Sequence, residues 1–155
     1  MAQLTIEVLG IYRLPSSPEL IQAQLAHFNR DWVGQHLDEA RRAAREELDG
    51  TVLVELQTRG RDGRLRLEDF TQRLDVPSEQ WQAPWMHVCL TDNGAEVKTP
   101  AFTDWPPSGD LRLAFYMHLW DPSRPLETSY GPVACPPPGA MPRRLWRLLP
   151  YEPVD

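Results

Sequence analysis

Apolar and polar residues alternate strictly at the start of the chain. This period-two pattern is typical of a strand with one buried face. The alternating residues are Gln3, Leu4, Thr5, Ile6, Glu7 and Val8. We expect the strand to run to about Leu14 and to end at the turn Pro15-Ser16-Ser17-Pro18.

The pattern changes to helical spacing after this turn. Ser17 can cap a helix that has Pro18 in its first position. We predict two helical segments, at about 18–32 and 37–49, with an interruption near Gly34. The second segment has a narrow apolar stripe, made of Leu37, Ala40, Ala44 and Leu48. Its opposite face is charged, which is typical of a solvated helix surface.

Period-two patterning returns at Thr51 and continues through the middle of the chain. A turn that contains Gly63 predicts a hairpin between the strand at 52–58 and the residues 65–67. A further strand is expected at 85–91, with a short partner at 95–99. The strongest alternation lies at 111–120, which we expect to be a central strand with Phe115 and Met117 buried.

The last part of the chain is rich in proline and yet carries apolar residues. Of the 16 prolines, 12 lie from Pro100 onward. Proline cannot donate to a sheet ladder, so this part does not predict central strands. A flexible linker would lack residues such as Leu145, Trp146 and Leu149. We therefore expect 121–155 to be a tail that packs along the domain, with one short helix at 142–149.

Together these patterns predict a single α+β domain over residues 1–155. The order of elements is one strand, two helical segments, then four or five strands. This order favours a mostly antiparallel sheet of five to six strands, with both helical segments on one face. The length of 155 residues is enough to bury a substantial core.

Composition narrows the classes of function. The formal net charge of −6 disfavours a protein that binds nucleic acid. Lys98 is the single lysine among 16 basic residues, and no glycine-rich phosphate loop precedes it. The first residues lack a secretory signal pattern, and no apolar run approaches the roughly 18 residues of a membrane helix. These features predict a cytoplasmic protein that does not enter membranes.

Two predicted strands each have a second face that is neither clearly polar nor clearly apolar. Along 111–120 the residues opposite the core series include Tyr116, His118 and Trp120, and along 85–91 they include Trp85 and His87. If the two strands are neighbours, these five residues form one aromatic surface with polar groups, a pattern typical of ligand sites. The alternative is a second core that the proline-rich tail covers. The sequence leaves both interpretations open.

No residue set predicts catalysis, a metal or a cofactor. His87, Cys89, His118 and Cys135 are residue types that bind zinc, but their spacing forms no clustered pair. No Gly-x-Ser-x-Gly motif is present, and the histidines at 27 and 36 are expected to be exposed helical residues. We therefore predict no catalytic residues, no metal ligands and no cofactor.

Two hypotheses of function follow. The first is a non-enzymatic protein-binding module of the inhibitor or immunity type, favoured by the acidic charge, by the many Trp, Tyr and Arg residues and by the lack of catalytic motifs. The second is a small-molecule-binding protein or enzyme that uses the predicted aromatic surface. A flat exposed aromatic patch would favour the first, and a deep pocket beside His118 would favour the second.

Overall fold

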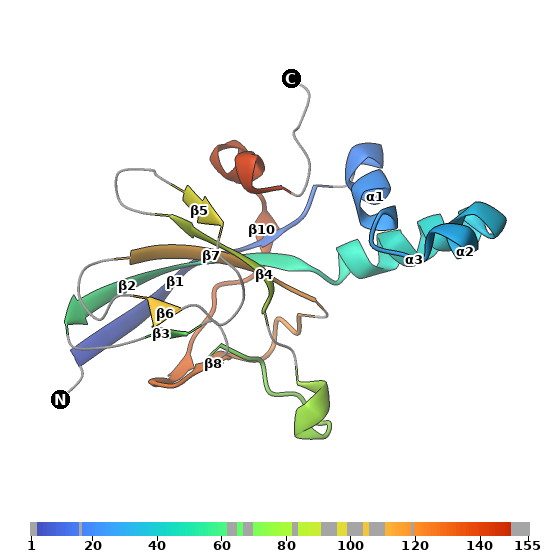
Figure 1. Cartoon of the computed structure of the whole chain (residues 1–155). Helices are drawn as coiled ribbons and strands as arrows, with labels where there is room; N and C mark the ends of the chain where they lie inside the picture. Colours follow the sequence, from blue (N-terminus) through green and yellow to red (C-terminus); the bar gives the residue numbers. More distant parts are fainter. Residues whose placement is uncertain are drawn as a thin grey trace.

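A computed structural model shows the arrangement of the elements (Figure 1). It describes residues 3–15, 17–61, 65–66, 70–81, 84–90, 96–98, 104–105, 111–118 and 120–149. Side chains are described for these residues except at 3–4, 60–61, 65–66, 84–90, 96–98, 104–105, 111 and 147.

A six-stranded sheet with the order β10-β1-β2-β7-β4-β5 forms the centre of the fold. Its neighbouring strands are antiparallel, except that β10 runs parallel to β1. The strands are β1 Gln3–Arg13, β2 Val52–Arg61, β4 Pro84–Leu90, β5 Glu96–Lys98, β7 Leu111–Met117 and β10 Gly139–Ala140. The predicted α+β class is confirmed, and β7 is central, as expected.

The predicted hairpin after β2 is wrong. Both edges of β2 are occupied, one by β1 and the other by β7. Strand β3 (Leu65–Arg66) instead pairs with β6 (Asp104–Trp105) in a separate two-stranded sheet. A second two-stranded sheet joins β8 (Leu126–Thr128) to β9 (Gly131–Val133).

Three helices form an arm that projects from one end of the main sheet (Figure 1). They are α1 (Pro18–Leu25), α2 (Arg30–Gln35) and α3 (Leu37–Asp49). Their apolar residues pack on one another, with Leu25, Ala40 and Ala44 as the buried centre. The prediction that the helical segments lie on one face of the sheet is therefore wrong. We call these three helices the helical arm.

Local capping by side chains explains where α1 and α2 begin. The Ser17 side chain accepts a hydrogen bond from the backbone N–H of Leu20, and Pro18 follows it, as predicted. Asn29 caps α2 in the same way by accepting from Trp32. This second cap divides the segment expected at 18–32, so that α1 ends at Leu25.

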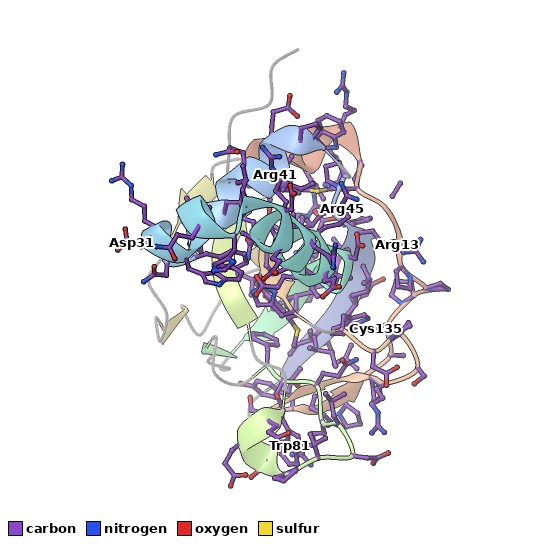
Figure 2. The ribbon with its side chains drawn as sticks, turned by 90° about the vertical axis from the view of Figure 1, so that its right-hand side faces the viewer. Arg13, Asp31, Arg41, Arg45, Trp81 and Cys135 are labelled. Carbon is purple, nitrogen blue, oxygen red and sulfur yellow. The ribbon has the colours of Figure 1, made fainter. Side chains whose placement is uncertain are left out.

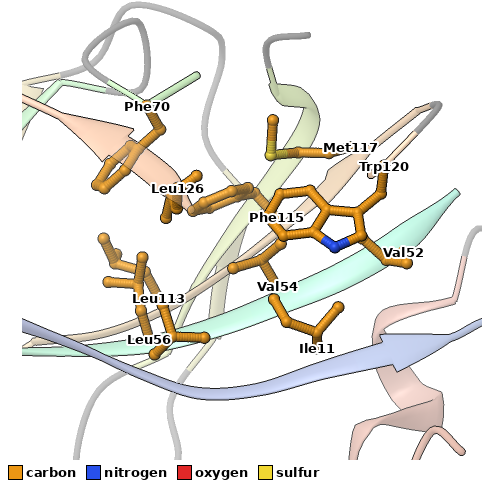
Figure 3. Close-up of a cluster of buried hydrophobic side chains, with 11 residues drawn as sticks. Ile11, Val52, Val54, Leu56, Phe70, Leu113, Phe115, Met117, Trp120 and Leu126 are labelled. Atoms are coloured by element: carbon orange, nitrogen blue, oxygen red, sulfur yellow. The ribbon is translucent and has the colours of Figure 1, made fainter. Parts of the chain in front are cut away.

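The sheet buries a core on each of its two faces. The first core contains the predicted series Leu113, Phe115 and Met117 together with Phe70 and Leu126, which come from other elements (Figure 3). Phe115 and Met117 are fully buried, as predicted. The second core lies on the opposite face. Its buried members are Leu53, Ala114, Tyr116, Met141, Leu145, Leu148 and Leu149.

The C-terminal segment contributes to both cores. Val133 and Cys135 pack against the first core, and β10 then pairs with the Tyr12 and Arg13 end of β1. The 3-10 helix η3 (Arg143–Leu148) follows and lies over the second core.

Candidate functional site

The five residues of the predicted aromatic surface do not form one open face. Tyr116 is fully buried in the second core, beneath η3. Its hydroxyl donates a hydrogen bond of 2.6 Å to the backbone carbonyl of Leu148. The ring and its polar group are thus both occupied by the C-terminal segment.

Trp120 belongs to the opposite core from Tyr116. Its ring packs with Phe115 and Met117 in the first core, as Figure 3 shows. Strand β7 ends at Met117, and the backbone N–H of Trp120 donates to the carbonyl of Gly50. Side chains alternate between the two faces only within a strand. Because β7 ends before Trp120, this side chain does not lie on the face that the alternation predicts. The prediction that Trp120 and Tyr116 share a face is wrong.

Backbone register places the two residues of β4 differently from the prediction. Tyr116 is paired with Met86, and His87 is paired with Phe115. The register shifts between Pro84 and Met86, at the position of Trp85. The side chains of Trp85 and His87 lie outside the described part of the structure.

His118 lies where β7 meets the end of α3. Its Nδ1 atom is 2.7 Å from the Thr51 hydroxyl, which in turn donates to the carbonyl of Glu47 over 2.6 Å. The hydroxyl has a single proton, so His118 Nδ1 carries the hydrogen that joins the two side chains. Burial lowers the pKa of His118, although the charge of Glu47 acts in the opposite direction.

Stability is expected to fall as this histidine is protonated. A pKa that is lower in the folded state means that the unfolded chain binds the proton more readily. The contribution of neutral His118 to the free energy of unfolding is therefore present above a pH of about 6.5, and it is lost as the pH falls below this value. Urea unfolding at pH 7.5 and pH 5.5 tests this. The decrease in the free energy of unfolding between pH 7.5 and pH 5.5 should be smaller in His118→Asn than in the wild type. An equal decrease in both proteins would show that His118 does not cause it.

A buried ionic network lies on the second-core face of the sheet, and the sequence did not predict it. Glu55 of β2 is fully buried, and Arg144 of η3 binds both of its carboxylate oxygens, at 2.8 and 2.9 Å. The Tyr12 hydroxyl donates to the same carboxylate at 3.2 Å. The available signal was a single acidic residue among the apolar residues 52–56.

This network holds the carboxylate in its charged form. Burial alone raises the pKa of Glu55, but the hydrogen bonds and charge of Arg144 outweigh it, with help from Tyr12 and from the charge of Arg112. The net pKa of Glu55 is lowered. Burial and the neighbouring Glu55 raise the pKa of Tyr12. The arrangement fits a structural connection between the sheet and η3, because the carboxylate is already fully bonded.

Gly10 leaves the space that Tyr12 needs for this contact. Strand β1 has a bulge at Leu9, after which Gly10 pairs with Glu55 and Tyr12 pairs with Leu53. A Cβ atom at Gly10 would lie 2.2 Å from the Tyr12 hydroxyl oxygen. The tyrosine ring therefore crosses directly over the glycine.

Gly10→Ala is expected to lower stability by about 1–2 kcal/mol, because the ring must move away from Glu55. Chemical denaturation measures this change. In a Tyr12→Ala background, the same substitution should have little effect, since the ring is absent. A similar loss in both backgrounds would show that Tyr12 does not cause it.

Two further features of the described residues concern metal binding and thiol reactivity. No group of three or more His, Cys, Asp and Glu side chains gathers there in a way that could hold a metal ion. The Cys135 thiol donates to the carbonyl of Val133, and burial raises its pKa. A raised pKa keeps a thiol in its less reactive, protonated form.

The tip of the helical arm exposes a ridge of aromatic side chains. The Phe28 and Trp32 rings meet edge to face with centroids 6.1 Å apart, and Trp32 and His36 follow at 5.9 Å. Trp32 is 38% exposed and Leu37 is 42% exposed. Helix α2 buries none of its own residues. We call Phe28, Trp32, His36 and Leu37 the arm ridge.

A shallow groove runs along the helical arm beside this ridge. Its first part has a volume of about 330 Å³ and is lined by Gln22, Leu25, Ala26, Phe28, Arg30 and Val33. Its second part has about 250 Å³ and is lined by Pro18, Ile21, Gln22, Arg41 and Arg45. The two parts have Gln22 as a common lining residue, and we call them together the arm groove.

Arginine side chains border the arm groove. Arg41 and Arg45 lie on the side of α3 toward α1 (Figure 2), and Arg42 lines the adjoining surface with Asp38. All three arginines are exposed. The ion pairs seen among the described residues involve Arg124 and Arg144 and none of these three. Helical spacing alone predicts that this charged face is solvated surface, because the spacing cannot show a neighbouring groove.

Within the part of the chain that the structure describes, no helix is long and apolar enough to cross a membrane. Comparison of the chain with family models, with curated proteins and with solved structures found no match.

Proposed function

We propose that this chain is a non-enzymatic protein-binding module of the inhibitor or immunity type, which contacts its partner through the helical arm. The observation that carries the proposal is the arm ridge. It places the exposed Trp32 ring against the rings of Phe28 and His36, and the exposed Leu37 follows His36 directly in the sequence. Contiguous exposed apolar residues are typical of interaction sites, whereas scattered ones are not.

The construction of α2 supports this proposal. A helix of six residues is too short to be stable alone, and α2 buries none of its residues. It is held by the Asn29 cap and by partial burial of Val33 against the arm core. The chain thus orders a short helix whose largest side chain, Trp32, faces solvent. Tryptophan is among the residues that most often dominate binding energy at interfaces.

The ligand-site alternative has less support. Its central residue, Tyr116, is buried beneath η3 and bonded to Leu148. Trp120 lies in the other core. Burial of these two rings leaves no aromatic surface that combines them, whereas the arm ridge is exposed.

A binding experiment with matched variants tests the proposal. Affinity capture with the full chain as bait supplies candidate partners, and titration calorimetry between purified proteins then measures the dissociation constant. Trp32→Ala is expected to weaken binding by about 30-fold, which corresponds to a hot-spot residue of about 2 kcal/mol. Equal thermal unfolding midpoints would show that the variant is folded.

Tyr130→Ala is the matched control. Tyr130 is also 38% exposed, and it lies between β8 and β9. Strand β8 lies away from the helical arm (Figure 1). Its replacement should leave the dissociation constant unchanged. A partner whose binding depends on Tyr130 and not on Trp32 would contradict the assignment to the arm, and failure of every purified candidate to bind would contradict the proposed function.

A further inference from the structure

The arm groove combines an apolar floor with a basic border. The floor is formed by Ile21, Leu25, Phe28 and Val33, and each of these side chains also packs with the arm core. The border contains the guanidinium groups of Arg30, Arg41 and Arg45. An occupant that matches this surface needs apolar side chains on one side and acidic side chains at its edges.

The charge of the residues that line the arm groove differs in sign from the charge of the chain. Four arginines, at 30, 41, 42 and 45, line the groove and its adjoining surfaces, where Asp38 and Asp49 supply the opposing charge. The chain as a whole has a net charge of −6. The helical arm as a whole carries four arginines and seven acidic residues, but the described lining of the groove contains three of the arginines and no acidic residue. A basic patch on an acidic protein steers an acidic partner to one place.

From this geometry we infer that the arm groove binds an acidic, amphipathic segment of a protein partner. The inference rests on the proposed function and specifies the chemistry of the partner. Apolar residues of the segment lie on Ile21, Leu25 and Phe28, while its carboxylates meet the arginine border. Helix α3 has 13 residues and so a length of about 20 Å, which suits three to four turns of a bound helix.

An acidic protein segment fits this surface better than nucleic acid or an anionic membrane. Phosphate backbones bind where basic groups dominate a large area, but the net charge of −6 opposes their approach. The carboxylates of Asp38 and Asp49 also stand beside the arginines. A narrow groove with an apolar floor matches side chains of a peptide rather than a continuous row of phosphates.

Selection from a random-peptide display library against the full chain tests this inference. The enriched peptides are expected to combine Asp or Glu with Leu, Ile or Phe at helical spacing. Fluorescence anisotropy with the synthesised peptides then gives the dissociation constants. Arg41→Glu should weaken binding by about tenfold or more, because a like charge then faces the acidic residues. Binding should also weaken as salt is raised.

Arg59→Glu provides the matched charge reversal. Arg59 is an exposed residue near the C-terminal end of β2, and this end of the strand lies away from the helical arm (Figure 1). Its replacement should change the dissociation constant by less than about twofold. Equal unfolding midpoints for the two variants would establish that both are folded. An effect of the same size in both variants would overturn the inference, since it would reflect only the overall charge.

Three other results would also overturn the inference. Peptides that lose binding in Trp32→Ala but not in Arg41→Glu would place the partner on the arm ridge alone, and the proposed function would stand. Binding of a short DNA duplex or of phosphatidylserine vesicles, lost in Arg41→Glu, would assign the arginines to phosphate groups. Absence of any enriched peptide would leave the groove without the proposed occupant.

Discussion

Replacement of Phe115 by alanine is expected to cost about 3–5 kcal/mol of unfolding free energy. Phe115 is fully buried in the first core, and its ring lies 5.1 Å from the Phe70 ring, centroid to centroid. Alanine would leave a cavity between the sheet and the residues that cover it, because the central strand β7 cannot move to fill it. The loss is a large part of the roughly 5–15 kcal/mol that stabilises a typical domain. Urea unfolding measures it.

Phe115→Leu separates this cavity effect from a general effect of substitution. Leucine keeps most of the apolar volume, so its cost should stay below about 1.5 kcal/mol. A loss under about 1 kcal/mol for alanine would mean that Phe115 is not buried as described, since a buried Phe is expected to cost several times more.

Arg144→Met is expected to be the second most destabilising of these changes, at about 2–3 kcal/mol. Removing one partner of a buried ion pair leaves the other charge without compensation, which costs about 3–5 kcal/mol when both groups are buried. Glu55 is fully buried, but the Arg144 side chain is 53% exposed, so we expect a smaller loss. The double variant Glu55→Leu/Arg144→Met should recover much of the stability, because the isolated charge is then absent.

The effect of Arg144→Met should also depend on pH. Without Arg144, burial raises the pKa of Glu55 above its unfolded value, so protonation favours the folded variant. In the wild type the pKa of Glu55 is lowered, and its contribution is kept until the pH falls below about 4.5. The difference in stability between the two proteins should therefore be smaller at pH 5 than at pH 7. A difference that is independent of pH would show that Glu55 is not the group left unpaired.

The two predictions concern opposite faces of one sheet. Phe115 reports on a core that is held by apolar contact alone. Arg144 reports on the attachment of η3, where Tyr116 and Leu148 form a further hydrogen bond. If both substitutions behave as expected, the C-terminal segment is an integral layer of the fold.

Local patterns determined the elements whose signals lie within a few residues. The alternation at 111–120 predicted both the strand and the burial of Phe115 and Met117. Ser17 and Pro18 predicted the start of α1, because a cap needs only the residues next to it. Charge and periodicity also indicated that α3 has a charged outer face, and its described residues at 41, 42 and 45 are exposed.

Only the tertiary structure decided which surfaces meet. The bulge at Leu9 moved Tyr12 to the face of Glu55, and the end of β7 at Met117 moved Trp120 into the first core. Neither change has a strong signal in the neighbouring sequence. A one-residue shift in register nevertheless moves every later side chain of a strand to the other face. The same limit hid the pairing of Glu55 with Arg144, which are 89 residues apart. Partners so distant in sequence are chosen by the packing of the whole chain. The arm groove arises in the same way where α1 packs with α2 and α3.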